Sequence, residues 1–130
     1  MEWFEERAEE GLEILKKLLS QPKFSISGPS TFPEQSGIYA FFLKNANPGE
    51  FLRAGRADNL RQRIYQNHLM GNQSDNLRSQ LVKDGQCADH EAKKWIRENC
   101  MVQYLVVKNK EERKWAEHSI LSVLRPKYSD

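Results

Sequence analysis

Three segments of the chain hold side chains that suit chemistry on phosphate groups. The segment 37–39 (Gly-Ile-Tyr) supplies a phenol, and the segment 53–63 places four arginines around a glycine. The segment 117–129 begins with a glutamate and ends in Arg-Pro-Lys-Tyr-Ser. An arginine side chain is a planar fork that matches phosphate oxygens. If the fold brings these segments together, they can form a phosphate-binding site with a phenol and a carboxylate beside it.

The elements that must position these segments are strands and helices of an α+β domain. Residues 37–43 and 51–54 are rich in strand formers and are predicted to pair as a β-hairpin. Gly55 is expected to end the second strand, and Asp58 to cap a helix that runs to about Leu69. The other predicted elements are helices at 3–20, 75–84, 88–98 and 111–124 and a third strand at 100–107. This order predicts a small antiparallel three-stranded sheet flanked by helices, with an extra N-terminal helix.

Composition and charge narrow the class of protein. The 130 residues are 29% charged and 38% hydrophobic, which fits one soluble domain rather than a disordered chain. No apolar run approaches the ~18 residues of a membrane span, and an acidic N-terminus argues against a signal peptide. Two cysteines favour a reducing cytoplasm. Residues 1–36 carry a net charge of −3 and residues 37–130 one of +5, so we expect an N-terminal helix and linker followed by the functional domain.

The amphipathic helices predict two buried stripes. In residues 3–20 the stripe is Phe4, Ala8, Leu12, Leu15 and Leu19. The stripe of the final helix is predicted to be Trp115, Ser119, Ile120, Val123 and Leu124. We expect the N-terminal helix either to pack on the domain or to dock a partner protein.

In its order of motifs, the chain resembles the GIY-YIG nuclease superfamily from about residue 36 to residue 129. The family's first triplet matches Gly37-Ile38-Tyr39, and its second triplet, Tyr-Ile-Gly, falls on Arg53-Ala54-Gly55, where the glycine is kept. The segment 56–63 then follows the family pattern, with Arg56 in the place of a lysine. The family's metal-binding glutamate matches Glu117. Its Pro-x-Tyr-Asn close matches 126–129, with Ser129 in place of the asparagine.

The resemblance implies a GIY-YIG-like fold and a DNA endonuclease that hydrolyses phosphodiester bonds with Mg²⁺ or Mn²⁺. In that family the phenol of Tyr39 would activate the water, with Arg53 and Arg56 lowering its pKa. Arg63 would hold the scissile phosphate, and Glu117 would hold the metal ion, which accepts a single carboxylate and several waters. The residues expected to contact nucleic acid are Arg53, Arg56, Arg61, Arg63, Asn67, His68 and Lys127. The sequence leaves open whether the DNA is branched or single-stranded.

Other interpretations of the same residues are retained. Tyr39 fits a half-buried strand tyrosine, and Glu117 fits an exposed residue paired with Arg113 or Lys114. Because Arg53 replaces a phenol, the chain also fits a catalytically impaired DNA-binding module of the same fold. A protein-interaction domain that docks through the N-terminal helix is the third alternative.

Overall fold

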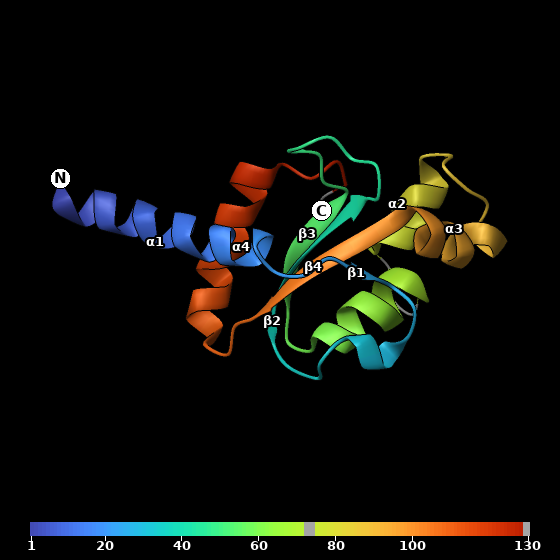
Figure 1. The fold of residues 1–130 in the computed structure, drawn as a ribbon, viewed down its shortest axis with the longest axis horizontal. Coiled ribbons are helices and arrows are strands. Elements are labelled where there is room, and N and C mark those ends of the chain that lie inside the picture. The colour runs from blue at the N-terminus through green and yellow to red at the C-terminus, as the bar shows by residue number, and fades with distance from the viewer. Residues whose placement is uncertain (72–74, 129–130) are drawn as a thin grey trace.

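The computed structural model describes residues 1–71 and 75–128, which form one antiparallel sheet with helices on both faces (Figure 1). The sheet has four strands in the order β1-β4-β2-β3, so the prediction of three strands is wrong. The strands are β1 (Phe24–Ser25), β2 (Gly37–Leu43), β3 (Arg53–Ala57) and β4 (Cys100–Val106). Strand β1 lies in the predicted linker and pairs with β4 through two residues, which is too short for a hydrophobic pattern to show.

The helices divide between the two faces of the sheet. On one face, α1 (Glu2–Leu19) and α4 (Lys110–Leu124) pack against Ile38, Ala40 and Ala54. The opposite face carries the rings of Tyr39 and Phe41 and is covered by η2 (Gln62–Leu69), α2 (Leu77–Lys83) and α3 (Ala92–Asn99). Two short turns of 3₁₀-helix, η1 (Pro29–Thr31) and η3 (Asp89–Glu91), complete the elements that the structure describes. No helix in these residues is long and apolar enough to cross a membrane.

Strand β3 contains Gly55, which we predicted would end it. The strand begins two residues later than predicted, and Gly55 pairs with Tyr39 of β2. Because β3 is an edge strand and Gly55 has no side chain, the hydroxyl of Tyr39 can approach the edge of the sheet at this point. The pairing of Tyr39 with Gly55 therefore determines which side chains lie together at this edge of the sheet.

Glycine is required at position 37 by the close packing of the backbone around it. A Cβ atom at this position would lie 2.2 Å from the carbonyl oxygen of Leu105 and 2.8 Å from a methyl group of Leu60. The closer of these atoms belongs to the backbone of β4, and Leu60 is fully buried in the core. Glycine is therefore the residue that lets β2 approach β4 and the following helix at this point.

Helix η2 is a π-helix, a form that is rare in proteins and frequent at functional sites. The amide of Met70 donates to the carbonyl of Tyr65, five residues earlier, at 3.0 Å. Residues five apart therefore lie on the same face of this helix. The consequence is that His68, five residues after Arg63, reaches the same atom as Arg63, the hydroxyl oxygen of Tyr39.

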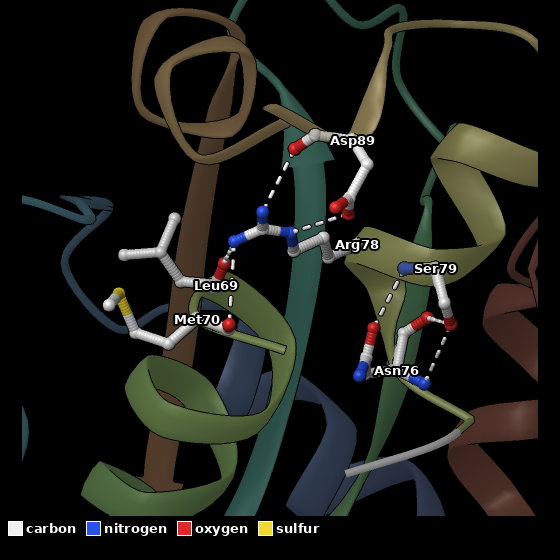
Figure 2. Close-up of polar contacts among 6 residues, drawn as sticks. All are labelled: Leu69, Met70, Asn76, Arg78, Ser79 and Asp89. Carbon is white, nitrogen blue, oxygen red and sulfur yellow. Dashed lines mark hydrogen bonds and ion pairs between the residues drawn. The ribbon is translucent and has the colours of Figure 1, made fainter. Parts of the chain in front are cut away.

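Arg78 of α2 ties the end of η2 to its neighbours, as Figure 2 shows. Its guanidinium donates to the carbonyls of Leu69 and Met70, both at 3.3 Å, and to the backbone and side chain of Asp89. Helix α2 itself begins with a capping box in which Asn76 accepts a hydrogen bond from the amide of Ser79 at 2.7 Å (Figure 2). These contacts fix the helix that carries Arg63 and His68.

The predicted stripe of α4 is partly wrong. The buried residues of this helix are Arg113, Ala116, Ile120 and Leu124, whereas Trp115 and Val123 are exposed. The stripe is rotated because Arg113 turns inward, where it donates to the hydroxyl of Ser36 and to the carbonyls of Val107 and Lys108. Arg113 therefore does not pair with Glu117.

Candidate active site

Tyr39 and Glu117 meet beside Gly55 at the edge of the sheet. The point where a Cβ on Gly55 would lie is 3.0 Å from Tyr39 Oη and 3.5 Å from Glu117 Oε2. Helix α4 packs on the face opposite the tyrosine ring, but the glutamate reaches the edge of β3, where it accepts a hydrogen bond from the amide of Arg56 at 3.1 Å. A phenol and a carboxylate from opposite layers thus approach the same glycine at the edge of the sheet.

The hydroxyl of Tyr39 has two further partners on helix η2. His68 Nε2 lies 2.8 Å from it, and Arg63 Nε donates to it at 3.2 Å. The tyrosine is fully buried, whereas Arg63 is half-buried. The terminal nitrogens of Arg63 donate to no atom within the described part of the chain, which leaves them available to phosphate oxygens.

The hydrogen bond between His68 and Tyr39 has a direction set by the backbone. The amide of Leu77 donates to His68 Nδ1 at 2.8 Å, so this nitrogen carries no proton. In the neutral imidazole the proton is then on Nε2, which donates to Tyr39 Oη. His68 cannot act as the base for the tyrosine proton in this tautomer.

Burial and positive charge act in opposite directions on these two groups. Burial raises the pKa of the Tyr39 phenol, while the hydrogen bond and charge of Arg63 and the charge of Arg53 lower it. Burial also holds the pKa of His68 well below its usual value, and the charges of Arg63 and Arg53 add to this effect. The histidine is therefore neutral at pH 7, and Tyr39 accepts hydrogen bonds from two donors.

Glu117 is held by one residue through two contacts. Arg56 donates its backbone amide to Oε2, and its Nε lies 3.4 Å from Oε1. The glutamate side chain is 28% exposed and that of Arg56 is 42% exposed, so solvent reaches both. The contact with the edge-strand amide fixes the carboxylate beside Gly55, and the guanidinium of Arg56 lies on the solvent side of it.

The carboxylate of Glu117 has the chemistry to bind a divalent cation such as Mg²⁺. Within the described residues no group of three or more His, Cys, Asp and Glu side chains could enclose a metal. Mg²⁺ does not need such a group, since it keeps several waters and binds through one or two carboxylates together with substrate phosphates. Glu117 offers hard carboxylate oxygens that solvent reaches, so it can bind Mg²⁺ in this way. The guanidinium of Arg56 competes with a cation for the same carboxylate.

Arg53 lies away from solvent. It is 2% exposed, and its guanidinium donates to Gln80 Oε1 at 2.6 Å and to the carbonyl of Asp75 at 3.2 Å. It therefore anchors α2 and the residue before its cap to the sheet. The expectation that Arg53 contacts nucleic acid does not fit this geometry, whereas its positive charge does act on Tyr39.

Arg61, Lys127 and Asn67 do not join the site, whereas His68 belongs to it through its contact with Tyr39 Oη. Arg61 donates to the carbonyl of Phe32 and to Glu34, so its guanidinium is held by the chain. Lys127 pairs with Asp84 at 3.3 Å. Asn67 and His68 are both buried, so neither has a surface to offer to nucleic acid. Ser129 lies outside the described residues.

The sequence did not indicate the contact of His68 with Tyr39, and it predicted wrongly that Gly55 ends its strand. Asn67 and His68 were both expected to contact nucleic acid, but it is His68, five residues after Arg63 in the π-helix, that contacts Tyr39 Oη. The available signal was a histidine in the same helical stretch as Arg63. Gly55 was matched to the family motif, but its approach to Tyr39 and Glu117 needed coordinates.

Two solved structures have a fold similar to that of this chain. Both are the GIY-YIG N-terminal endonuclease domain of UvrC from Thermotoga maritima, one a point mutant bound to its catalytic divalent cation and the other bound to magnesium. Each is 24% identical to this chain, covers 78% of it and 91% of the domain, and superposes with a TM-score of 0.50. No protein-family model and no curated protein matches the chain. The protein has a GIY-YIG nuclease-like fold, as the resemblance in its sequence predicted.

Proposed function

We propose that this protein is a divalent-metal-dependent endonuclease that hydrolyses phosphodiester bonds in DNA. The observation that carries the proposal is the meeting of Tyr39 Oη and Glu117 Oε2 at Gly55, with Arg63 bonded to the same phenol. A base, a cation ligand and a phosphate-binding guanidinium are the groups that this reaction requires. The fold shared with endonuclease domains supports the same class of reaction.

In the proposed reaction Tyr39 takes the proton of the attacking water. Two donors, Arg63 Nε and His68 Nε2, stabilise the phenolate form that accepts this proton. The terminal nitrogens of Arg63 bind the non-bridging phosphate oxygens and stabilise the charge that develops on them. Glu117 would hold Mg²⁺ or Mn²⁺, which supplies charge stabilisation at the phosphate and the leaving oxygen when bound.

Arg56 changes partner in this scheme. In the structure its guanidinium neutralises Glu117, but a bound phosphate offers it two oxygens in place of one carboxylate oxygen. The movement would release the carboxylate for a cation as substrate enters. Arg56 stays protonated throughout, so it stabilises charge and does not act as a base.

The test is nicking of supercoiled plasmid and of branched and single-stranded DNA substrates with Mg²⁺ or Mn²⁺. We expect Glu117→Gln to abolish cutting and to keep metal-free DNA binding, and Arg63→Ala to lower the rate by roughly 10³ and to weaken binding. The matched control is Arg61→Ala, which removes an arginine from the same helical stretch but outside the site. If wild type cuts no DNA under any of these conditions, the proposal is wrong.

One observation favours a second candidate, a DNA-binding module without cleavage. Arg56 contacts both oxygens of Glu117, so the carboxylate is already neutralised without a cation. In this case Arg56 and Arg63 form a phosphate grip. Wild type would then bind DNA with a strong salt dependence but release no product, and Glu117→Gln would bind as wild type does.

A further inference from the structure

Helix α1 extends beyond the body of the domain, as Figure 1 shows. The buried residues of this helix, Ile14, Leu15 and Leu18, all lie in its second half. In its first half Trp3 is 56% exposed and Phe4 is 55% exposed. An isolated half-helix gains little stability from its own hydrogen bonds, so a helix of this kind is normally stabilised by packing.

An open groove of about 1380 Å³ runs between α1, α4 and the end of β4. Its apolar lining includes Ile14, Leu105, Val107 and Ala116, and Trp115, which is 62% exposed, forms one wall. A helix about 10 Å across fits such a groove over roughly two to three turns. Ile14, Val107 and Ala116 are largely buried at the base of this groove, whereas Leu105 is partly exposed and Trp115 leaves an aromatic wall that the described residues do not cover.

The rim of the groove is acidic. Five carboxylates line it against three basic side chains: Glu6, Glu9, Glu10, Glu13 and Glu112, against Arg7, Lys17 and Lys108. A net negative rim repels nucleic acid and attracts a positively charged segment. This surface therefore differs in charge from the arginine-bearing site at β3.

We propose that this groove binds a basic amphipathic helix of a partner protein. Its apolar face would lie on the floor beside Trp115, and its lysines or arginines would meet the acidic rim, which is a known mode of helix recognition. A second copy of α1 is a poor occupant because this helix itself carries six glutamates against three basic residues. The charge of the groove therefore selects a partner of opposite sign.

The groove and the candidate active site lie on different faces of α4. Trp115 and Glu117 are two residues apart, which separates them by about 200° around a helix. Glu117 reaches β3, and Trp115 lines the groove with α1. A partner in the groove would leave the site open to substrate.

The test uses a fluorescein-labelled 16-residue peptide of leucine and lysine at helical spacing as probe, measured by fluorescence anisotropy on the full chain. The comparison peptides are a scrambled peptide of the same composition and one with glutamate in place of lysine. We expect the amphipathic basic peptide to bind about tenfold more tightly than the scrambled one, with no binding of the acidic one. Bound peptide should also shift the tryptophan emission to shorter wavelength.

Two pairs of variants separate the groove from general charge attraction. Glu10→Gln with Glu112→Gln should weaken peptide binding about fivefold or more, whereas Glu91→Gln with Glu98→Gln, exposed elsewhere, should change it less than twofold. Trp115→Ala should weaken binding, and Met70→Ala, an exposed apolar residue outside the groove, should not. Thermal melts of each variant confirm that it is folded.

Three results would overturn the proposal. The first is equal affinity for the amphipathic and the scrambled peptide, and the second is an equal effect of the two double substitutions. The third is a stable dimer in light scattering that Trp115→Ala dissociates, because the groove would then be filled by a second copy. Failure of the nuclease proposal would change none of these readouts, since Glu117→Gln should bind the peptide as wild type does.

Discussion

Tyr39 Oη and His68 Nε2 lie 2.8 Å apart, and the direction of their hydrogen bond is set by a third group, the amide of Leu77. That amide occupies the other ring nitrogen, so the histidine donates to the phenol. The start of α2 therefore determines the protonation pattern of a side chain in the candidate site. His68 is a positioning residue in this arrangement, because it acts through Tyr39.

The first prediction concerns stability against pH. Because the folded-state pKa of His68 is held well below its unfolded value of ~6.5, the unfolded chain binds the extra proton first. Above about pH 6.5 His68 is neutral in both states and does not change the free energy of unfolding. Below that pH the free energy of unfolding should fall by up to ~1.4 kcal/mol per pH unit. Urea unfolding between pH 5 and 7.5 measures this slope.

His68→Gln should reduce the slope, and His90→Gln should not, since His90 is exposed. Equal slopes for wild type and His68→Gln would show that another group titrates in this range. Both proteins should be compared at a single ionic strength.

The second prediction concerns the phenol of Tyr39. Its pKa lies above the usual value, so the phenolate fraction should rise about tenfold per pH unit from pH 6 to 9, and the cutting rate should rise with it. Tyr39→Phe should abolish cutting and lower stability by about 1–3 kcal/mol, because Arg63 and His68 lose a buried acceptor. Tyr104→Phe is the control tyrosine. A cutting rate that does not depend on pH would exclude Tyr39 as the base.

The third prediction concerns the approach at Gly55. Gly55→Ala would place a methyl group 3.0 Å from Tyr39 Oη and 3.5 Å from Glu117 Oε2. We expect at least a tenfold loss in cutting rate with a stability change of about 1 kcal/mol. Gly28→Ala is the matched control, because its methyl group would meet nothing within 4 Å. Unchanged cutting by Gly55→Ala would place the reaction elsewhere.

The fourth prediction concerns the tyrosine of the family's second triplet. Arg53→Tyr would restore the family residue but remove the buried contacts to Gln80 and Asp75. We therefore expect a loss of about 3 kcal/mol in the free energy of unfolding and no gain in cutting. Arg61→Ala should cost less, about 1 kcal/mol, since Arg61 is only partly buried. A stable and faster Arg53→Tyr protein would contradict the anchoring role.

The extents of the long elements could be predicted from the sequence because their hydrophobic periods are strong, although of the stripe predicted for α1 only Leu15 is buried. Helix α1, strand β2 and helix α4 lie within a residue or two of their predicted bounds. Strand β1 could not be predicted, because its two residues become a strand through pairing with β4. The outward position of Trp115 was missed because the pattern does not show that Arg113 has partners inside the fold.

In the candidate site, the sequence predicted residue identities better than contacts. Tyr39, Arg63 and Glu117 were chosen by motif, and whether they perform the proposed chemistry remains a prediction. Arg53 was expected to face phosphate, but the positions of Gln80 and Asp75 depend on tertiary packing. The pairing of Arg56 with Glu117 spans 61 residues and could not be read from local spacing.

The π-helix of η2 has a consequence for how such chains are aligned. One extra residue wound into a helix acts as an insertion that leaves both ends of the helix in place. A motif with fixed spacing places the residue four positions after Arg63 at Asn67, and an alignment with a one-residue gap after Arg63 places it at His68. Deleting one residue between Arg63 and His68 should therefore rewind this stretch as an α-helix and keep the imidazole against Tyr39.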